Sequence, residues 1–205
     1  MAILIHPTYF PSIAHFVAMV KADTVVFEMA DNFQKQTLRN RTYVYAANGR
    51  LLLNVPVVYT QKNRQKYCEV KVFNDENWQR NHWKSLLSAY STSPFFEFYS
   101  DELAPLFKKE FTNLMELNLE TIRLICDCLQ LDLNVAETTD FEKDVQDKTD
   151  LRALVNAKLE QPKFDAYQQV FSEKHGFINN LSILDLLFNE GPNTLNYLQS
   201  QSLNV

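Results

Sequence analysis

Glycine is scarce in this chain, which contains only Gly49, Gly176 and Gly191, all far apart. A phosphate-binding P-loop and a dinucleotide-binding fingerprint both need clustered glycines, because the backbone must approach the phosphates closely. A nucleophile elbow also needs glycines beside the nucleophile, and none is present. The sequence therefore excludes ordinary P-loop kinases and simple Rossmann dehydrogenases.

The N-terminal residues predict two parallel strands joined by a helix. Residues 3–5 form a short apolar run that ends at Pro7, and residues 24–29 form a second β-rich run. Ser12 precedes a helical pattern between them, where its hydroxyl can cap the first turn. A strand, a helix and a strand within about thirty residues indicate a right-handed crossover.

The next segment predicts an antiparallel β-meander. Residues 41–45 and 51–59 flank Asn48-Gly49, a strong hairpin signal, and Pro56 indicates an edge or a bulge. Residues 66–73 alternate between apolar and polar side chains and predict a third strand. Alternation along these strands would place many cations of the segment on one face.

Helical periodicity then dominates the chain. It predicts helices over residues 75–90, 103–107 and 111–131. A last helix should begin at a capping box formed by Ser182 and Asp185 and end at Gly191. Residues 133–138 resemble a further strand, and residues 139–160 are too polar to assign. The class is α/β, with a small mixed sheet, a parallel βαβ start, an antiparallel β-meander and a helical C-terminal half. At 205 residues we expect one domain, residues 1–205.

Charge is distributed unevenly along the chain. Between Lys35 and Lys71 there are eight basic residues and one acid, Glu69, so this segment has a net charge of +7. The whole chain has a net charge of −5, so the residues outside the segment sum to −12. This asymmetry predicts an anionic partner for one face, most simply a small molecule. Nucleic acid is disfavoured, because the chain is acidic overall and lacks the aromatic-interleaved motifs of single-strand binders.

Cysteine and histidine spacing predicts neither disulfides nor a metal site. Cys68, Cys126 and Cys128 form no framework, and the four histidines lack the spacing of zinc ligands, so we expect no metal and no cofactor. Cations near Cys68 can activate a thiol, but an inward-facing strand residue is the favoured interpretation. Without a membrane-length apolar run or a signal peptide, we expect a reduced, cytoplasmic protein.

The first candidate site lies at residues 35–41. Its cations are Lys35, Arg39 and Arg41, and its other polar side chains are Gln36, Thr37 and Asn40. Arg binds phosphate or carboxylate bidentately, whereas amides and hydroxyls match sugar hydroxyls. A solvated β-surface whose cations pair with acidic helices is an equally supported alternative.

The other candidate sites centre on histidines. His6 and Tyr9 follow the first strand, at the edge where open α/β sheets bind ligands, and His6 can act as a general base. A tight turn with a buried, satisfied His6 is the slightly favoured alternative. We expect His82 to lie across its helix from Trp78, which is a core residue in this interpretation. His175 near a helix start is a weak anion-binding candidate.

Five short motifs follow one another along nearly the whole chain. They are Pro7-x-Tyr9-Phe10-Pro11, Lys35-Gln36-Thr37-x-Arg39-Asn40-Arg41, Leu53-x-Val55-Pro56-Val57, Trp78-x-x-x-His82-Trp83 with Ser93-Pro94-Phe95-Phe96, and Asn180-Leu181-Ser182-Ile183-Leu184-Asp185-Leu186-Leu187-Phe188-Asn189. In this order and spacing they resemble the WbqC-like protein family.

The resemblance implies a bacterial cytoplasmic protein linked to O-antigen-type surface polysaccharide. It further implies transfer of an acyl or aminoacyl group, such as glycine, to an amino sugar or nucleotide-linked sugar. The three cations of residues 35–41 would bind the anionic group of the ligand, and Gln36, Thr37 and Asn40 would orient the acceptor. Tyr9 would contact the ligand, and His6 or His82 would deprotonate the amine. Whether the protein is an enzyme stays open. The alternative is a non-catalytic binding or assembly protein that recruits an acidic partner.

Two departures from the family pattern bear on this expectation. Many members carry Gln where this chain has His6, and longer members carry a Gly-rich segment ahead of the C-terminal motif. Here that region, about residues 140–165, is short and has no glycine. The resemblance then implies either a smaller ligand or a lost activity, and it leaves the oligomeric state undefined.

Overall fold

We describe the molecule from a computed structural model covering residues 1–60 and 64–203, in which the N-terminal strands join a four-stranded parallel sheet. Its strand order is β7-β2-β1-β8, with bounds β1 Ala2–Ile5, β2 Thr24–Phe27, β7 Val135–Glu137 and β8 Thr149–Asp150. Ile3 of β1 pairs with Val25 of β2 on one side and with Thr149 of β8 on the other. The predicted α/β class and the strand at residues 133–138 are confirmed.

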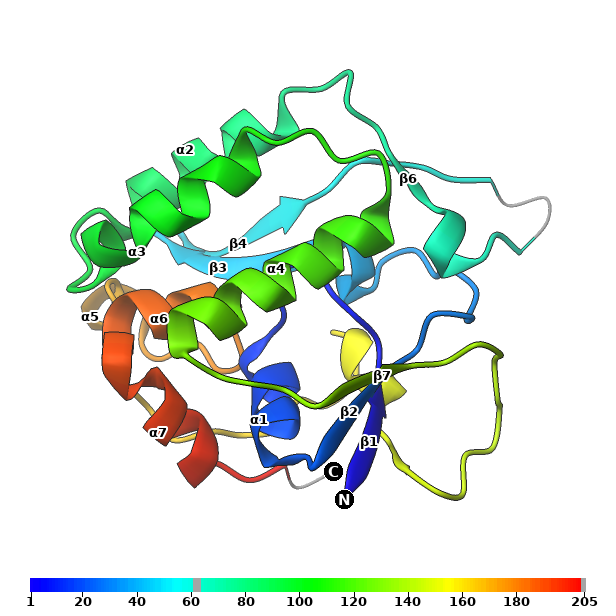
Figure 1. The fold of residues 1–205 in the computed structure, drawn as a ribbon. Helices are drawn as coiled ribbons and strands as arrows, with labels where there is room; N and C mark the ends of the chain where they lie inside the picture. Colours follow the sequence, from blue (N-terminus) through cyan, green and yellow to red (C-terminus); the bar gives the residue numbers. More distant parts are fainter. Residues whose placement is uncertain (61–63, 204–205) are drawn as a thin grey trace.

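The helix α1, Ile13–Lys21, makes the predicted crossover from β1 to β2 (Figure 1). Residues 13–19 are all buried, which suits a helix packed between the sheet and the C-terminal helices. The predicted side-chain cap is not made, however. The hydroxyl of Ser12 lies 2.8 Å from Nδ1 of His15 instead, because both side chains are buried and need a partner.

The antiparallel part consists of two strand pairs. The hairpin of β3 Arg41–Ala46 and β4 Gly49–Asn54 is the one predicted, with Gly49 at φ +96°. A second pair joins β5 Val57–Val58 to β6 Lys71–Val72, so the ladders are separate and not one continuous meander. Much of the predicted third strand is a 3₁₀ turn, η2 Tyr67–Glu69, because the Tyr67 side chain is buried and donates to the carbonyl of Pro7 at 2.7 Å.

Helices cover this framework (Figure 1). They are α2 Trp78–Tyr90, α3 Phe96–Leu103, α4 Leu114–Leu129, α5 Ser172–His175, α6 Ile183–Glu190 and α7 Thr194–Ser200, with 3₁₀ turns η1 Leu38–Asn40, η3 Ala104–Phe107, η4 Arg152–Val155 and η5 Gly191–Asn193. α2 and α6 pack against β3, and α7 packs against α1. One hydrophobic core therefore runs from the parallel sheet to the hairpin.

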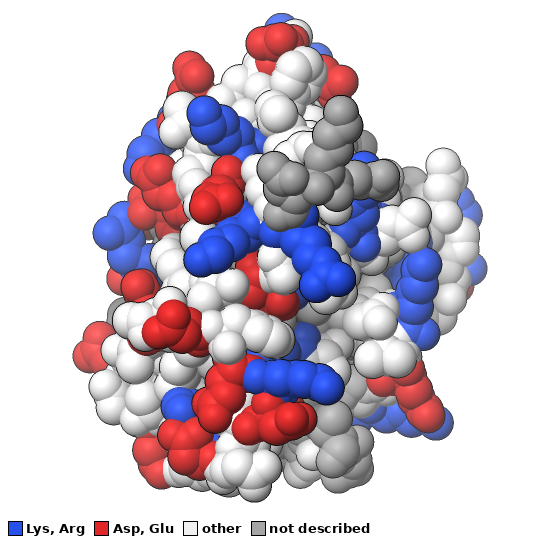
Figure 2. Space-filling model, turned by 90° about the vertical axis from the view of Figure 1, so that its right-hand side faces the viewer, with Lys and Arg blue, Asp and Glu red and all other residues white. Residues whose placement is uncertain are grey.

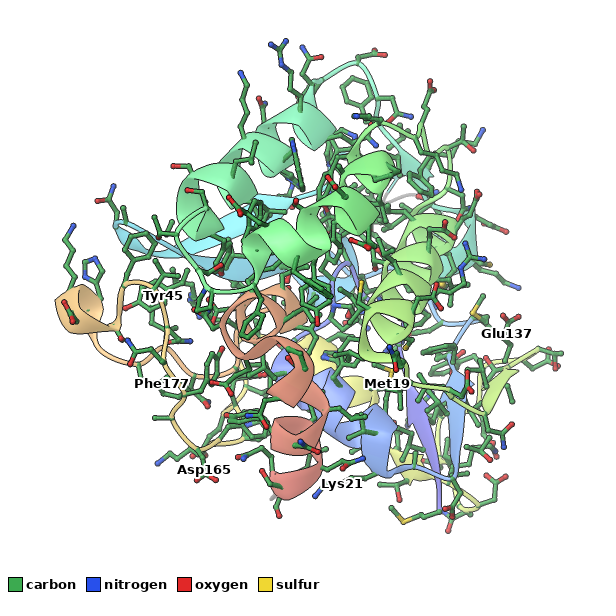
Figure 3. The ribbon with its side chains drawn as sticks, turned by 60° about the vertical axis from the view of Figure 1, so that its left-hand side comes forward. Met19, Lys21, Tyr45, Glu137, Asp165 and Phe177 are labelled. Atoms are coloured by element: carbon green, nitrogen blue, oxygen red, sulfur yellow. The ribbon has the colours of Figure 1, made fainter. Side chains whose placement is uncertain are left out.

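Polar groups hold α5 and α6 in place. The hydroxyl of Tyr45 on β3 lies 2.7 Å from the carbonyl of Gly176 and 3.1 Å from that of Phe171, the residues that flank α5. Figure 3 shows Tyr45 on the same side of the molecule as Phe177. Ser182 caps α6 by accepting from the Leu184 amide, as predicted. The Asp185 side chain does not complete a capping box. It turns into the core, where its two oxygens accept hydrogen bonds from Tyr90 and Tyr167.

Candidate functional site

Charged side chains gather where the strands of the parallel sheet end. His6 follows β1, Glu28 follows β2 and Asp150 ends β8, so the carboxyl ends of three strands converge on one edge. β1 also lies at the point where the strand order reverses, with β2 on one side and β8 on the other. Open α/β sheets bind ligands in the crevice outside this edge.

Asp31, Arg39 and His6 form the first part of this sheet-edge cluster. Arg39 NH2 donates to Asp31 Oδ2 at 2.7 Å, and His6 Nε2 lies 2.9 Å from the same oxygen. Arg39 and His6 are almost fully buried. His6 Nε2 also lies 2.8 Å from Arg39 NH2. When Nε2 carries the proton, His6 and Arg39 both donate to Asp31, and Nδ1 presents a lone pair without a partner among the described residues; in the other tautomer Nε2 accepts from Arg39.

Burial and the charge of Arg39 control the protonation of this group. Burial, which disfavours the charged imidazole, is the main reason why the pKa of His6 lies below 6.5, and the neighbouring guanidinium lowers it further. Burial alone would raise the pKa of Asp31, but the hydrogen bond from His6 and the charge of Arg39 outweigh it and lower that pKa. A neutral His6 beside an ionised Asp31 follows.

Arg152 links the carboxyl ends of β2 and β8. Its guanidinium donates to the fully buried Glu28 at 3.2 Å and to Asp150 at 2.6 Å, and the hydrogen bond to Asp150 is the main cause that raises the pKa of Arg152. The other oxygen of Glu28 accepts from the hydroxyl of Thr138, directly after β7. Arg152 lies in the region of residues 139–160 that the sequence pattern left unassigned.

A pocket of about 540 Å³ lies outside this cluster. Its lining combines charged, amide and aromatic side chains, namely Lys35, Arg41 and Glu76, then Gln36, Asn40 and Asn54, then Phe33, Tyr59 and Phe73. Its volume is within the range of small-molecule sites, and a few polar groups on partly apolar walls are typical of them. We call this the Arg41 pocket.

Two buried polar atoms of the Arg41 pocket lack a partner within the described part of the chain. They are Nε of Arg41 and Oδ1 of Asn40. Asn40 is 6% exposed, and its amide nitrogen is already used, donating to the carbonyl of Val55 at 2.9 Å. Unpartnered buried polar groups are costly, and both of these belong to residues that line the pocket.

The segment predicted as one anion site is divided by the structure. Lys35, Gln36, Asn40 and Arg41 line the Arg41 pocket, whereas Arg39 turns inward to Asp31. Thr37 is also buried, and its hydroxyl lies 3.3 Å from Arg39 NH1. The structure therefore brings four of these six side chains to the pocket. Arg39 belongs to the sheet-edge cluster instead, and Thr37 lies beside Arg39.

Tyr9 and His82 meet in the interior. The Tyr9 hydroxyl lies 3.0 Å from His82 Nδ1, and a backbone hydrogen bond with Asn54 also engages the imidazole. Burial lowers the pKa of His82 to about 4. The expectation that His82 lies across the helix from Trp78 is wrong, because residues four apart share a helix face, and the two rings are 5.3 Å apart.

The structure adds residues that the sequence pattern did not indicate. Asp31 follows the second strand at the ligand-binding edge of the sheet, and that position was a usable signal. Asn54, Tyr59 and Glu76 reach the Arg41 pocket from separate segments, and nothing in their local sequence marks them. The weak candidate His175 belongs to neither group, since its Nε2 lies 3.0 Å from the carbonyl of Ala47.

Within residues 1–60 and 64–203, no group of three or more His, Cys, Asp or Glu side chains is arranged to hold a metal ion. Nor does any helix in these ranges have the length and apolar character needed to cross a membrane.

The chain belongs to the WbqC-like protein family, which matches residues 6–163. It is also similar to the uncharacterized protein Rv1507c of Mycobacterium tuberculosis (strain ATCC 25618 / H37Rv), with 26% identity over 224 residues that cover 96% of each chain. No solved structure matches the chain. Membership of this family suggests a role in polysaccharide biosynthesis at most.

Proposed function

We propose that this protein binds an anionic sugar derivative, a sugar phosphate or a nucleotide-linked sugar, in the Arg41 pocket. The observation that carries the proposal is that Arg41 and Asn40, each with a buried polar atom that has no partner among the described residues, both line that pocket. Phosphate oxygens can accept from a guanidinium, and sugar hydroxyls can donate to an amide oxygen. A ligand that carries both groups is therefore matched to the two side chains, Arg41 and Asn40.

The aromatic side chains of the pocket suit the remainder of such a ligand. Phe33, Tyr59 and Phe73 supply apolar walls, and the rings of Phe33 and Tyr59 are 5.4 Å apart. The ammonium of Lys35 lies 4.4 Å from the centre of the Tyr59 ring, at the rim of the same pocket. Apolar surfaces flanked by cations match a sugar ring or a base that carries phosphate.

The reaction we propose is transfer of an acyl or aminoacyl group to the amine of an amino sugar, in the synthesis of bacterial surface polysaccharide. The amine nitrogen forms a bond to the carbonyl carbon of an activated ester or thioester. The bond from that carbon to the leaving oxygen or sulfur breaks, and the leaving group departs with its electron pair. The amine loses one proton to a base.

His6 is the base that we favour in this proposal. Asp31 orients its Nε2, and Nδ1 is unpartnered in the described chain, which is how a neutral imidazole is prepared to take a proton. His82 has less capacity to do so, because Tyr9 and the backbone of Asn54 already engage it. His6 does not line the pocket, so this role stays a prediction, as does that of His82.

Substitution of Arg41 tests the binding proposal. Arg41→Gln removes the charge while preserving much of the side-chain length, and Arg80→Gln, on the exposed side of α2, is the matched control. Binding of UDP-glucose and UDP-glucosamine is measured by calorimetry. We expect R41Q to weaken binding about 10- to 100-fold, because a charge-assisted hydrogen bond is lost, with R80Q unchanged. Equal effects of both changes, or early melting of R41Q alone, would contradict the proposal.

A non-catalytic binding protein is the alternative. It would recruit an acidic partner through a basic face, but Lys and Arg are interspersed with Asp and Glu on the face drawn in Figure 2. Salt-sensitive capture of a protein partner, with no binding of nucleotide sugars or sugar phosphates, would favour this alternative.

A further inference from the structure

We infer that Glu76 recognises a protonated amino group, so that the Arg41 pocket selects a ligand carrying both an anion and an amine. The inference rests on the proposed function and adds a specificity-determining residue to it. Glu76 is the one carboxylate among the residues that line the pocket, at the start of the segment leading into α2.

The charges of the pocket are separated from one another. Lys35, Arg41 and Glu76 all line it, yet within the described chain none of the three forms an ion pair. Lys35 lies over the Tyr59 ring and not beside an acid. Positive and negative groups are therefore available to different parts of one ligand.

A carboxylate is unfavourable in a pocket built only for phosphate. Glu76 would repel the anion and lower its affinity unless the ligand places a positive group beside it. An amino sugar phosphate has this distribution of charge. Its phosphate can contact Arg41 and Lys35 while its ammonium contacts Glu76, and the pocket of about 540 Å³ has room for both. A neutral sugar phosphate leaves Glu76 without a partner.

Recognition of the ammonium also orients the nitrogen that would react. An ammonium has no lone pair, so it must release one proton before it can attack a carbonyl carbon. Holding the nitrogen at a fixed position lowers the entropic part of the barrier to this attack. Glu76 is a positioning residue in this scheme, and the proton acceptor is a separate group.

A matched pair of ligands and of variants tests the inference. Glucosamine 1-phosphate and glucose 1-phosphate differ by an amino and a hydroxyl group, and Glu76→Gln is compared with Asp75→Asn, its exposed neighbour that does not line the pocket. We expect the wild type to bind the amino ligand about tenfold more tightly by calorimetry, as one charged hydrogen bond would give. We expect E76Q to lose this preference while binding glucose 1-phosphate at least as well, and D75N to retain it.

The outcomes separate this inference from the function on which it rests. If E76Q keeps the preference, or D75N loses it equally, Glu76 does not contact the amine and the inference is overturned. If R41Q still weakens both ligands in that case, the binding proposal stands. If the wild type binds neither ligand, nor the UDP-sugars, both proposals are overturned.

Discussion

Arg39 NH2 donates to Asp31 Oδ2 at 2.7 Å, and this bond connects the two sides of the loop that leads from β2 to β3. The carbonyl of Arg39 accepts from Asn118 Nδ2 on α4 at 2.6 Å, so the same residue is anchored from two directions. The next two residues, Asn40 and Arg41, face the pocket. The position of the pocket wall therefore depends on a buried ion pair behind it.

We expect Asp31→Ala to destabilise the protein by about 3 kcal/mol, because it leaves the buried guanidinium of Arg39 without its counter-charge. Urea denaturation followed by circular dichroism measures the change. The double variant Asp31→Leu with Arg39→Met removes both charges and should recover part of the loss. If Asp31→Ala costs less than about 1 kcal/mol, the pair is not the anchor that the geometry indicates.

Stability should fall steeply below pH 6.5, because buried histidines are held neutral. Burial lowers the pKa of His15 to about 3 and that of His82 to about 4, so the unfolded chain binds more protons than the folded one once the pH is below 6.5. Stability from these groups is present above pH 6.5 and is lost as the pH falls toward their folded pKa values. From pH 7 to pH 5 we expect a loss of about 3 to 4 kcal/mol from the two together.

His82→Asn provides the control for this pH effect. Its amide can replace Nδ1 beside the Tyr9 hydroxyl but does not titrate. Between pH 7 and pH 5 the free energy of unfolding of the variant should fall by less than that of the wild type, and the difference should be about half of the loss expected from His15 and His82 together. An unchanged pH slope would show that His82 is not held neutral in the folded state.

The buried carboxylate of Asp185 should be needed for the packing of α6. It accepts from Tyr90 at 2.7 Å and from Gln169 at 2.9 Å, as well as from Tyr167. Asp185→Ala leaves the buried hydroxyls of Tyr90 and Tyr167 without their acceptor and removes one of the acceptors of Gln169, and we expect a loss of about 3 kcal/mol or more. Tyr90→Phe should cost about 1 to 2 kcal/mol, and a double-mutant cycle of the two changes should show coupling. Additive effects would exclude a direct bond.

Two glycines allow steric overlap to be separated from backbone strain. Gly191 has φ +52°, and a Cβ there would overlap the Phe95 ring. Gly176 has φ +73°, but a Cβ there would meet nothing. We expect Gly176→Ala to cost about 1 kcal/mol and Gly191→Ala about 3 kcal/mol in thermal or chemical unfolding. Equal costs would mean that Phe95 moves aside without loss.

Local patterns predicted those elements that local chemistry determines. The crossover of β1, α1 and β2, the hairpin at Gly49 and the ends of α6 follow from apolar runs, turn residues and caps. The strand β8 could not be predicted, because its two residues become a strand only by pairing with β1. Likewise, the alternation of residues 66–73 predicted one strand, but residues 67–69 form a 3₁₀ turn that buries Tyr67.

Only part of the candidate site could be predicted from the sequence. The composition of residues 35–41 indicated an anion site, and four of these side chains do share one pocket. A charge pattern does not reveal burial, so the inward turn of Arg39 toward Asp31 could not be foreseen. Glu76 and Asn54 come from other segments, and only the tertiary structure brings them to Arg41.

The order of the parallel sheet constrains how the chain can fold during synthesis. Ile3 pairs with Thr149, so β1 keeps an unpaired edge until residues near the end of the third quarter of the chain have left the ribosome. An open edge of an apolar strand is prone to pair with other chains. A nascent chain that stops before Thr149 would also lack Arg152, the partner of the buried Glu28. Such fragments should aggregate and require chaperones, whereas a chain that includes β8 covers this edge of β1.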